Sequence, residues 1–168
     1  MKPLNRKRIV LLILCILVPL ALGGISSVLT KDQMKIYHFL NKPPLSPPTW
    51  VFPIAWTILY LLMGLAWFRV LTSEADQKTK DTALLFFGLQ LALNFFWSLV
   101  FFNASAYLVA FIMLMAMWVL IILCTIWFFR IDRKAGWLMV PYIAWTTFAA
   151  YLNLAVYILS ITPSIRPR

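Results

Sequence analysis

The stretch from Ala83 to Phe129 reads ALLFFGLQLALNFFWSLVFFNASAYLVAFIMLMAMWVLIILCTIWFF. It contains no Asp, Glu, Lys, Arg or His. A helix needs about 20 predominantly apolar residues to cross a bilayer, so this stretch is long enough for two spans. Only Asn103, Ala104 and Ser105 separate the two apolar halves. Because so short a link joins antiparallel neighbours, the stretch predicts a membrane-spanning helical hairpin.

The rest of the chain extends this pattern. Its 168 residues are 63% hydrophobic and 12% charged, whereas soluble chains are about 45–50% apolar and about 25% charged. Five spans are predicted, at about residues 9–29, 50–71, 83–102, 106–129 and 137–161. A proline-rich loop, residues 30–49, is expected to form a shaped cap, because proline prevents a regular helix. The predicted fold is therefore all-α, an integral membrane bundle of five transmembrane helices in one domain, residues 1–168.

The first span has an alternative reading. A basic start and an apolar run that ends near Gly23 and Gly24 are also found in signal peptides. This run is longer than their usual length of about 7–15 residues, and no A-x-A cleavage site follows. We therefore favour a retained helix, kinked at Pro19.

The formal net charge of +10 first suggests a nucleic-acid partner. The Lys and Arg residues, however, stand at the ends of apolar runs, where membrane topology and anionic headgroups place them. With the N-terminus inside, the inner segments carry ten of the 15: Lys2, Arg6, Lys7, Arg8, Arg69, Lys78, Lys80, Arg130, Arg133 and Lys134. We therefore expect no nucleic acid and a cytoplasmic N-terminus. The expected location is a bacterial cell membrane.

The ionisable residues offer no conventional catalytic set. The five acids lie in the predicted loops: Asp32, Glu74, Asp76, Asp81 and Asp132. No buried carboxylate pair, nucleophile–base pair or intramembrane ion-coupling group is therefore expected. Cys15 and Cys124 fall inside spans and predict packing rather than a disulfide. His38 could ligate a haem iron, but a solvated imidazole is favoured, so no metal site and no obligatory cofactor are predicted.

Three spans carry an aromatic stripe that includes an amide or lies beside one. At about 100° per residue, the stripes are Trp56, Tyr60, Met63 and Trp67; Gln90, Asn94, Trp97 and Phe101; and Tyr142, Trp145, Ala149 and Asn153. An amide that faces lipid costs free energy, so Gln90, Asn94 and Asn153 should point inward. Flat rings beside a few polar groups suit a pocket for a flat apolar molecule, with helix packing as the alternative for any single stripe.

A small-residue pair lies roughly opposite the amide face of the third span. The spacing of Gly88 and Ala92 lets another helix approach closely. The pair predicts either a tight contact within the chain or the seam of a homodimer.

Four separated sequence blocks resemble one known family. The blocks are Lys42-Pro43, Pro47-Pro48 and Trp50-Val51-Phe52; Trp56-Thr57-x-Leu59-Tyr60-x-x-Met63-Gly64-x-Ala66; Gln90-Leu91-Ala92-Leu93-Asn94-x-x-Trp97 with Phe101-Phe102; and Pro141-Tyr142-x-x-Trp145-x-x-Phe148-x-x-x-Leu152-Asn153. In this order they resemble the TspO/MBR family of tryptophan-rich sensory proteins, translocator proteins and peripheral benzodiazepine receptors.

The resemblance implies a membrane receptor or sensor, usually a homodimer, with its pocket beneath the first loop. The implied ligands are porphyrins such as protoporphyrin IX and isoquinoline or benzodiazepine-type molecules. Carried over by motif, the binding residues would be Tyr37, Trp56, Tyr60, Asn94, Trp97, Trp145 and Ala149, with Phe52 and Pro53 near the mouth. Three alternatives stay open: facilitated porphyrin transport, a structural scaffold, and porphyrin degradation driven by light and oxygen, with Trp56 and Trp145 as redox partners.

The sequence also departs from the family pattern. Leu45 stands where a Trp is common between the proline pairs, and the residues before Trp56 read Pro53-Ile54-Ala55. After Tyr157 the next basic residue is Arg166, too distant for the short pattern associated with sterol contact. Sterol binding is therefore not expected.

Overall fold

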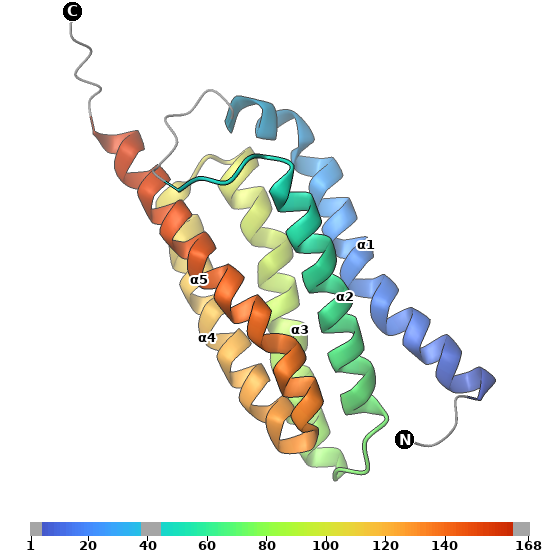
Figure 1. The fold of residues 1–168 in the computed structure, drawn as a ribbon. Coiled ribbons are helices and arrows are strands. Elements are labelled where there is room, and N and C mark those ends of the chain that lie inside the picture. The colour runs from blue at the N-terminus through green and yellow to red at the C-terminus, as the bar shows by residue number, and fades with distance from the viewer. Residues whose placement is uncertain (1–4, 38–44, 163–168) are drawn as a thin grey trace, which may run out of the picture.

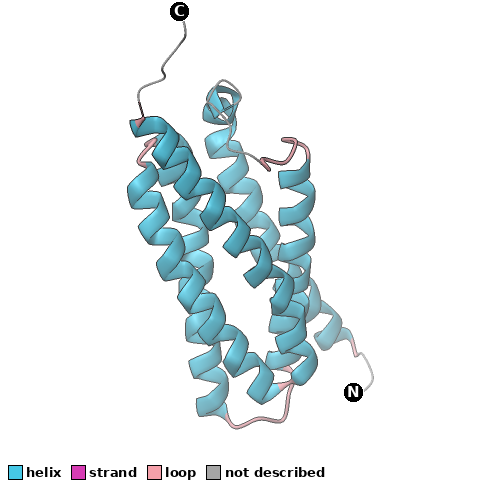
Figure 2. Cartoon of the chain, turned by 60° about the vertical axis from the view of Figure 1, so that its left-hand side comes forward, coloured by secondary structure: helices cyan, strands magenta, loops and turns pink. Residues whose placement is uncertain are grey.

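The computed structural model of the chain describes residues 5–37 and 45–162, those of 33–37 by their backbone alone. The helices are α1 (Arg6–Tyr37), α2 (Val51–Leu71), α3 (Gln77–Ser98), α4 (Tyr107–Ile131) and α5 (Arg133–Ile161), and a π-helical turn, η1 (Leu99–Asn103), continues α3. The five long helices lie lengthwise beside one another, with α1 at the edge next to α2 (Figure 1). The described residues form no strand, and their connections lie at the two ends of the bundle (Figure 2).

All five helices are long and apolar enough to cross a membrane. This confirms the predicted fold class and the number of spans. The third and fourth spans form the predicted hairpin, joined by residues 104–106 between η1 and α4. The start of α1 and the end of α5 lie at opposite ends of the bundle, as an odd number of spans requires (Figure 1).

The helices extend further than the apolar runs alone indicate. Residues 30–37, predicted as the first part of the cap loop, belong to α1 because this segment holds no proline. At the other end of the bundle, α3 begins at Gln77 because the Asp76 carboxylate accepts a hydrogen bond from the backbone N–H of Thr79 at 2.9 Å. Hydropathy therefore located the spans and missed the polar turns that extend them.

The main apolar core occupies the half of the bundle nearer the start of α1. Its buried side chains include Met63, Phe87, Met117, Phe128 and Met139. Large apolar side chains on the outer surface stay exposed, as expected for helices that contact lipid. Because apolar side chains fill the interior of this half, an apolar cavity can form only towards the opposite end of the described bundle.

Helix α1 packs closely against α2 at Gly64. A Cβ atom added there would lie 2.7 Å from the backbone oxygen of Cys15 and 2.7 Å from Cα of Ile16. The missing side chain lets the two backbones approach, as small residues do between membrane helices. This contact holds the edge helix against the bundle.

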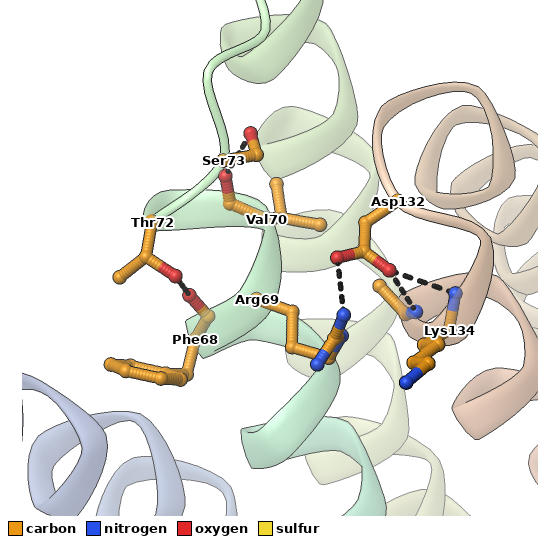
Figure 3. A network of polar contacts seen from close by, with 8 residues as sticks. Phe68, Arg69, Val70, Thr72, Ser73, Asp132 and Lys134 are labelled. Atoms are coloured by element: carbon orange, nitrogen blue, oxygen red, sulfur yellow. Dashed lines mark hydrogen bonds and ion pairs between the residues drawn. The ribbon is translucent and has the colours of Figure 1, made fainter. Parts of the chain in front are cut away.

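An ion pair joins the end of α2 to the start of α5 (Figure 3). Arg69 Nη2 lies 2.7 Å from Asp132 Oδ2, while Asp132 Oδ1 accepts hydrogen bonds from the backbone N–H groups of Lys134 and Ala135 at 2.8 and 3.1 Å. Partial burial raises the pKa of Asp132, but the Arg69 guanidinium and these two N–H groups outweigh burial and hold the pKa below its usual value. One carboxylate thus both caps α5 and fixes α2 beside it.

Candidate functional site

A cavity of about 380 Å³ lies between α1, α2, the α3–η1 segment and α5. It borders the apolar core, which includes Tyr60, and lies near the point where the first loop enters α2. Its volume falls within the range of about 300–1,000 Å³ typical of small-molecule pockets. Of the described residues that line it, none is Asp, Glu, Lys, Arg or His. A ligand would therefore be held by apolar burial, ring contacts and neutral hydrogen bonds.

Aromatic side chains form most of three walls. Trp56 and Tyr60 of α2 stack at 5.4 Å with an angle of 30° between their planes. Across the mouth, the Phe52 ring meets the Trp145 ring edge-on at 5.9 Å and 74°. In the α3–η1 segment, Trp97 stacks on Phe101 at 5.3 Å and 29°. Because each ring is held by another, the aromatic surface is fixed before any ligand arrives.

The fourth wall belongs to α1 and is built from small residues. The residues that it contributes are Leu20, Gly23, Gly24, Ser26, Ser27 and Thr30. The Tyr60 ring lies directly on Gly23, where an added Cβ atom would be 2.1 Å from Cε2 of the ring. Two polar contacts fix this wall: the hydroxyls of Ser26 and Ser98 hydrogen-bond each other, and Asn103 Nδ2 donates to the backbone oxygen of Leu29 at 3.1 Å.

The sequence predicts no part for α1 in the site, because this span carries no aromatic and amide stripe like those of the other three. The available signal was the cluster of glycine and hydroxyl residues at 23–30, uncommon for a helix face that meets only lipid. Other lining residues outside the expected set are Thr49, Thr57, Ser98, Phe102 and Leu152. They lie within one or two turns of the expected residues or at the end of the first loop.

A chain of four polar side chains leads from the cavity into the bundle centre. The Tyr60 hydroxyl donates to Asn94 Oδ1 at 2.9 Å, and Asn94 Nδ2 donates to the Tyr142 hydroxyl at 2.8 Å. The Tyr142 hydroxyl donates in turn to Gln90 Oε1 at 2.9 Å. All four side chains are buried, and Tyr60 and Asn94 line the cavity. The prediction that Gln90 and Asn94 point inward is confirmed.

The three cavity tryptophans differ in how their indole N–H groups are used. The Trp97 N–H donates to Asn153 Oδ1 at 3.1 Å, and Asn153 Nδ2 donates to the backbone oxygen of Tyr107 at 2.8 Å. The inward orientation predicted for Asn153 is thereby confirmed. Within the described part of the chain, the structure gives no hydrogen bond for the N–H of Trp56 or Trp145. These two indoles can therefore donate to a ligand, whereas that of Trp97 holds helices together.

The structure brings eight of the nine expected binding residues to the cavity. They are Phe52, Pro53, Trp56, Tyr60, Asn94, Trp97, Trp145 and Ala149. The side chain of Tyr37 lies outside the described residues, as does His38. Of the α2 stripe, only Trp56 and Tyr60 line the cavity. Met63 is buried in the apolar core, and Trp67 packs against Phe87 there at 5.2 Å. Spacing located the face correctly but not the depth at which the cavity ends.

Gly88 and Ala92 lie on the exposed side of α3. A Cβ atom added at Gly88 would meet nothing within 4 Å. A tight contact within the chain, one of the two explanations left open by the sequence, is therefore wrong. The exposed large side chains beside the pair are Leu85, Leu89 and Phe96. This face is available to lipid or to a second protein.

The sequence matches known proteins across most of its length. It matches the TspO/MBR family over residues 15–159. It is 37% identical to the tryptophan-rich protein TspO of Chlorobaculum tepidum over 151 residues, covering 89% of this chain and 96% of that protein. It is 47% identical to the tryptophan-rich sensory protein of Cereibacter sphaeroides over 118 residues, covering 70% and 72%. Identity to the human translocator protein is 32% over 129 residues, covering 75% of each. The chain, an integral membrane protein of five helices, thus belongs to the TspO/MBR family.

Proposed function

We propose that this protein is a membrane receptor or sensor that binds porphyrins and similarly flat, apolar ligands in the cavity. One observation carries the proposal: Trp56, Trp97 and Trp145 line a single cavity that no charged side chain of the described residues enters. Membership of a family whose relatives are named sensory and translocator proteins supports the receptor role.

The energetics favour a large flat ligand. Burying an aromatic side chain against such a ligand contributes about 1.5–3 kcal/mol, and rings from three helices can contribute together. Charged substituents of the ligand would lie outside the cavity, because burying an unpaired carboxylate costs free energy. The carboxylates of protoporphyrin IX would therefore lie at the mouth, beside Thr49 and Pro53, with the macrocycle inside. Isoquinoline and benzodiazepine-type molecules have the same flat apolar shape and are proposed for the same place.

Titration of purified protein with protoporphyrin IX, followed by quenching of tryptophan fluorescence, tests the proposal. Saturable binding is expected, and replacing Trp56→Phe together with Trp145→Phe should weaken it about tenfold through the lost ring surface. The matched control replaces Trp118→Phe and Trp127→Phe, two α4 tryptophans that do not line the cavity. The first donates to Thr147 at 2.8 Å and the second lies 4.7 Å from Arg130. Equal loss in both double variants would place the ligand elsewhere.

A second candidate function is porphyrin degradation driven by light and oxygen. It is favoured by two indoles that line the cavity, Trp56 and Trp145, whose N–H groups make no hydrogen bond to the described residues. Illumination in air should then bleach bound protoporphyrin in the wild type and spare it in the Trp56→Phe, Trp145→Phe variant. Identical spectra before and after illumination would dismiss this activity. Protein-dependent flux of porphyrin into liposomes would instead indicate facilitated transport.

We also propose how the protein dimerises and how it is oriented in the membrane. The exposed Gly88 and Ala92 face is assigned to the seam of a homodimer, because its small residues allow two helices to approach closely.

The N-terminus is assigned to the cytoplasm from the excess of Lys and Arg at that end of the bundle. A reporter fused after Arg168 should then be active only outside the cytoplasm, and cytoplasmic activity would reverse the orientation.

A further inference from the structure

The hydrogen-bond chain from Tyr60 to Gln90 has a direction. Tyr60 donates to Asn94 at 2.9 Å, Asn94 donates to Tyr142 at 2.8 Å, and Tyr142 donates to Gln90 at 2.9 Å. Every donor therefore lies nearer the cavity than its acceptor. This direction determines whether the residue at the cavity end donates a hydrogen bond to a ligand or accepts one from it.

Tyr60 is the first donor of the chain, and it lines the cavity. A phenolic hydroxyl has one hydrogen and an oxygen that can accept. Since the hydrogen is given to Asn94, the group that Tyr60 offers to a ligand is its oxygen. With the amides oriented as they are in the structure, donating to the ligand instead would leave Asn94 Oδ1 without that bond in a side chain that is only 5% exposed, which costs free energy.

At the Gln90 end, both directions of the hydrogen-bond chain make the same number of hydrogen bonds. Gln90 is fully buried, and its Nε2 atom has no partner among the described residues. If both amides turned over, Nε2 would donate to Tyr142 and Oε1 would become the atom without a partner. One atom of the Gln90 amide is left over in either case. The direction is therefore read at the cavity end, where Tyr60 donates to Asn94 in the structure.

The ring of Tyr60 is held in place independently of this chain. It stacks on Trp56 at 5.4 Å on one side and lies against Gly23 on the other. Its oxygen therefore keeps one position relative to the aromatic surface on which a flat ligand would lie. A hydrogen bond at a fixed place beside a flat surface discriminates between ligands of equal shape.

We infer that Tyr60 determines ligand specificity, its hydroxyl oxygen accepting a hydrogen bond from an N–H or O–H group on the edge of a flat apolar ligand. The inference rests on the proposed function, since it needs a flat ligand in this cavity. It narrows the ligand class: a ring system with a donor at its edge binds more tightly than one of the same shape with an acceptor there.

Carbazole and dibenzofuran form a matched pair of probes, because both are flat three-ring molecules and differ in an N–H against a ring oxygen. We would measure both affinities by calorimetry on the purified full chain in detergent. Wild-type protein should prefer carbazole by about threefold to tenfold, the value of one neutral hydrogen bond. Tyr60→Phe should abolish the preference, so that the variant binds the two probes equally. Partition into detergent is the same for every variant, so it cancels when their preferences are compared.

Tyr157→Phe is the control, a tyrosine of α5 that does not line the cavity, and it should keep the wild-type preference. If Tyr60→Phe does not fold, the N–H stretching frequency of carbazole bound to wild-type protein must still fall below its value in detergent. The inference is overturned by equal affinities, by a preference for dibenzofuran, by a preference that survives Tyr60→Phe, by an unshifted N–H stretch, or by binding of neither probe.

Protoporphyrin IX titration of the same wild-type sample separates this inference from the proposed function. Saturable porphyrin binding without a carbazole preference would refute the role of Tyr60 and leave the receptor proposal standing. A carbazole preference that depends on Tyr60, without saturable porphyrin binding, would refute the porphyrin proposal and leave Tyr60 as the acceptor.

Discussion

Two neighbouring glycines of α1 lie in the same cavity wall with opposite surroundings. An added Cβ atom at Gly23 would be 2.1 Å from the Tyr60 ring, which is backed by Trp56 and cannot move freely. An added Cβ atom at Gly24 would meet nothing within 4 Å. Gly23 therefore provides the room that the Tyr60 ring needs, whereas Gly24 borders open space.

This contrast gives a prediction for the paired variants. Gly23→Ala should displace Tyr60, lowering the thermal unfolding temperature and weakening flat-ligand binding. Gly24→Ala should keep binding and raise stability by up to about 1 kcal/mol, because alanine favours a helix more than glycine does. Thermal unfolding in detergent and ligand titration measure both effects. Equal behaviour of the two variants would show that Tyr60 does not pack on Gly23 as described.

The tryptophans show why residue type alone could not assign roles. Trp56, Trp97 and Trp145 were all expected at a ligand site, and all three line the cavity. Only the partner of the Trp97 indole, Asn153, identifies that ring as a link between helices. The pairing joins residues 56 positions apart, so it is invisible to helical spacing within one span.

At the scale of the helices, the apolar pattern predicted how many there are and which faces of α2, α3 and α5 turn inward. It could not predict where the helices end, since the charged turns at 77–82 and 133–136 are helical without being apolar. It also missed the α1 wall, because small residues carry little hydrophobic signal. That wall became visible only when packing placed Gly23 against Tyr60.

At the helix ends, we predict the effect of replacing Asp132 on stability. Asp132→Ala removes the cap of α5 and the partner of Arg69, so we expect a stability loss of about 0.5–2 kcal/mol from the cap, with a further loss from the ion pair. Asp76→Ala, which removes only the exposed cap of α3, is the matched control and should cost less. Thermal unfolding of the two variants in detergent provides the comparison.

The pH dependence of stability separates the two roles of Asp132. Because its pKa is lowered in the folded protein, its charge contributes stability above the pKa of the unfolded chain. That contribution is lost as the pH falls through the lowered value. Asp132→Asn keeps a capping oxygen but no charge, so the wild-type advantage over it should shrink on acidification. An advantage that does not change with pH would exclude the ion pair as its source.

At the scale of the whole molecule, the chain places its filled core at one end and its cavity at the other. The exposed Gly88 and Ala92 face lies on the outside of α3, so dimerisation and ligand binding can use different sides of one helix. The positive charges gather at the end with the filled core. With the proposed orientation, the mouth of the cavity therefore faces away from the cytoplasm.

The dimer seam yields a prediction at this scale. Gly88→Trp should convert a dimer to a monomer, because a large ring prevents close approach of two α3 helices. Ile112→Trp, on the exposed surface of α4, is the control and should stay dimeric. Light scattering after size-exclusion chromatography in detergent measures the oligomer. A monomeric wild type, or equal disruption by both variants, would remove the seam from Gly88.

The most direct test of the cavity as a ligand site is an experimental structure of the protein with protoporphyrin IX bound. Our account predicts the macrocycle between the rings of Trp56 and Trp145, with its carboxylates at the mouth beside Thr49 and Pro53. Macrocycle density confined to the outer surface of the bundle, with the cavity unfilled, would contradict it.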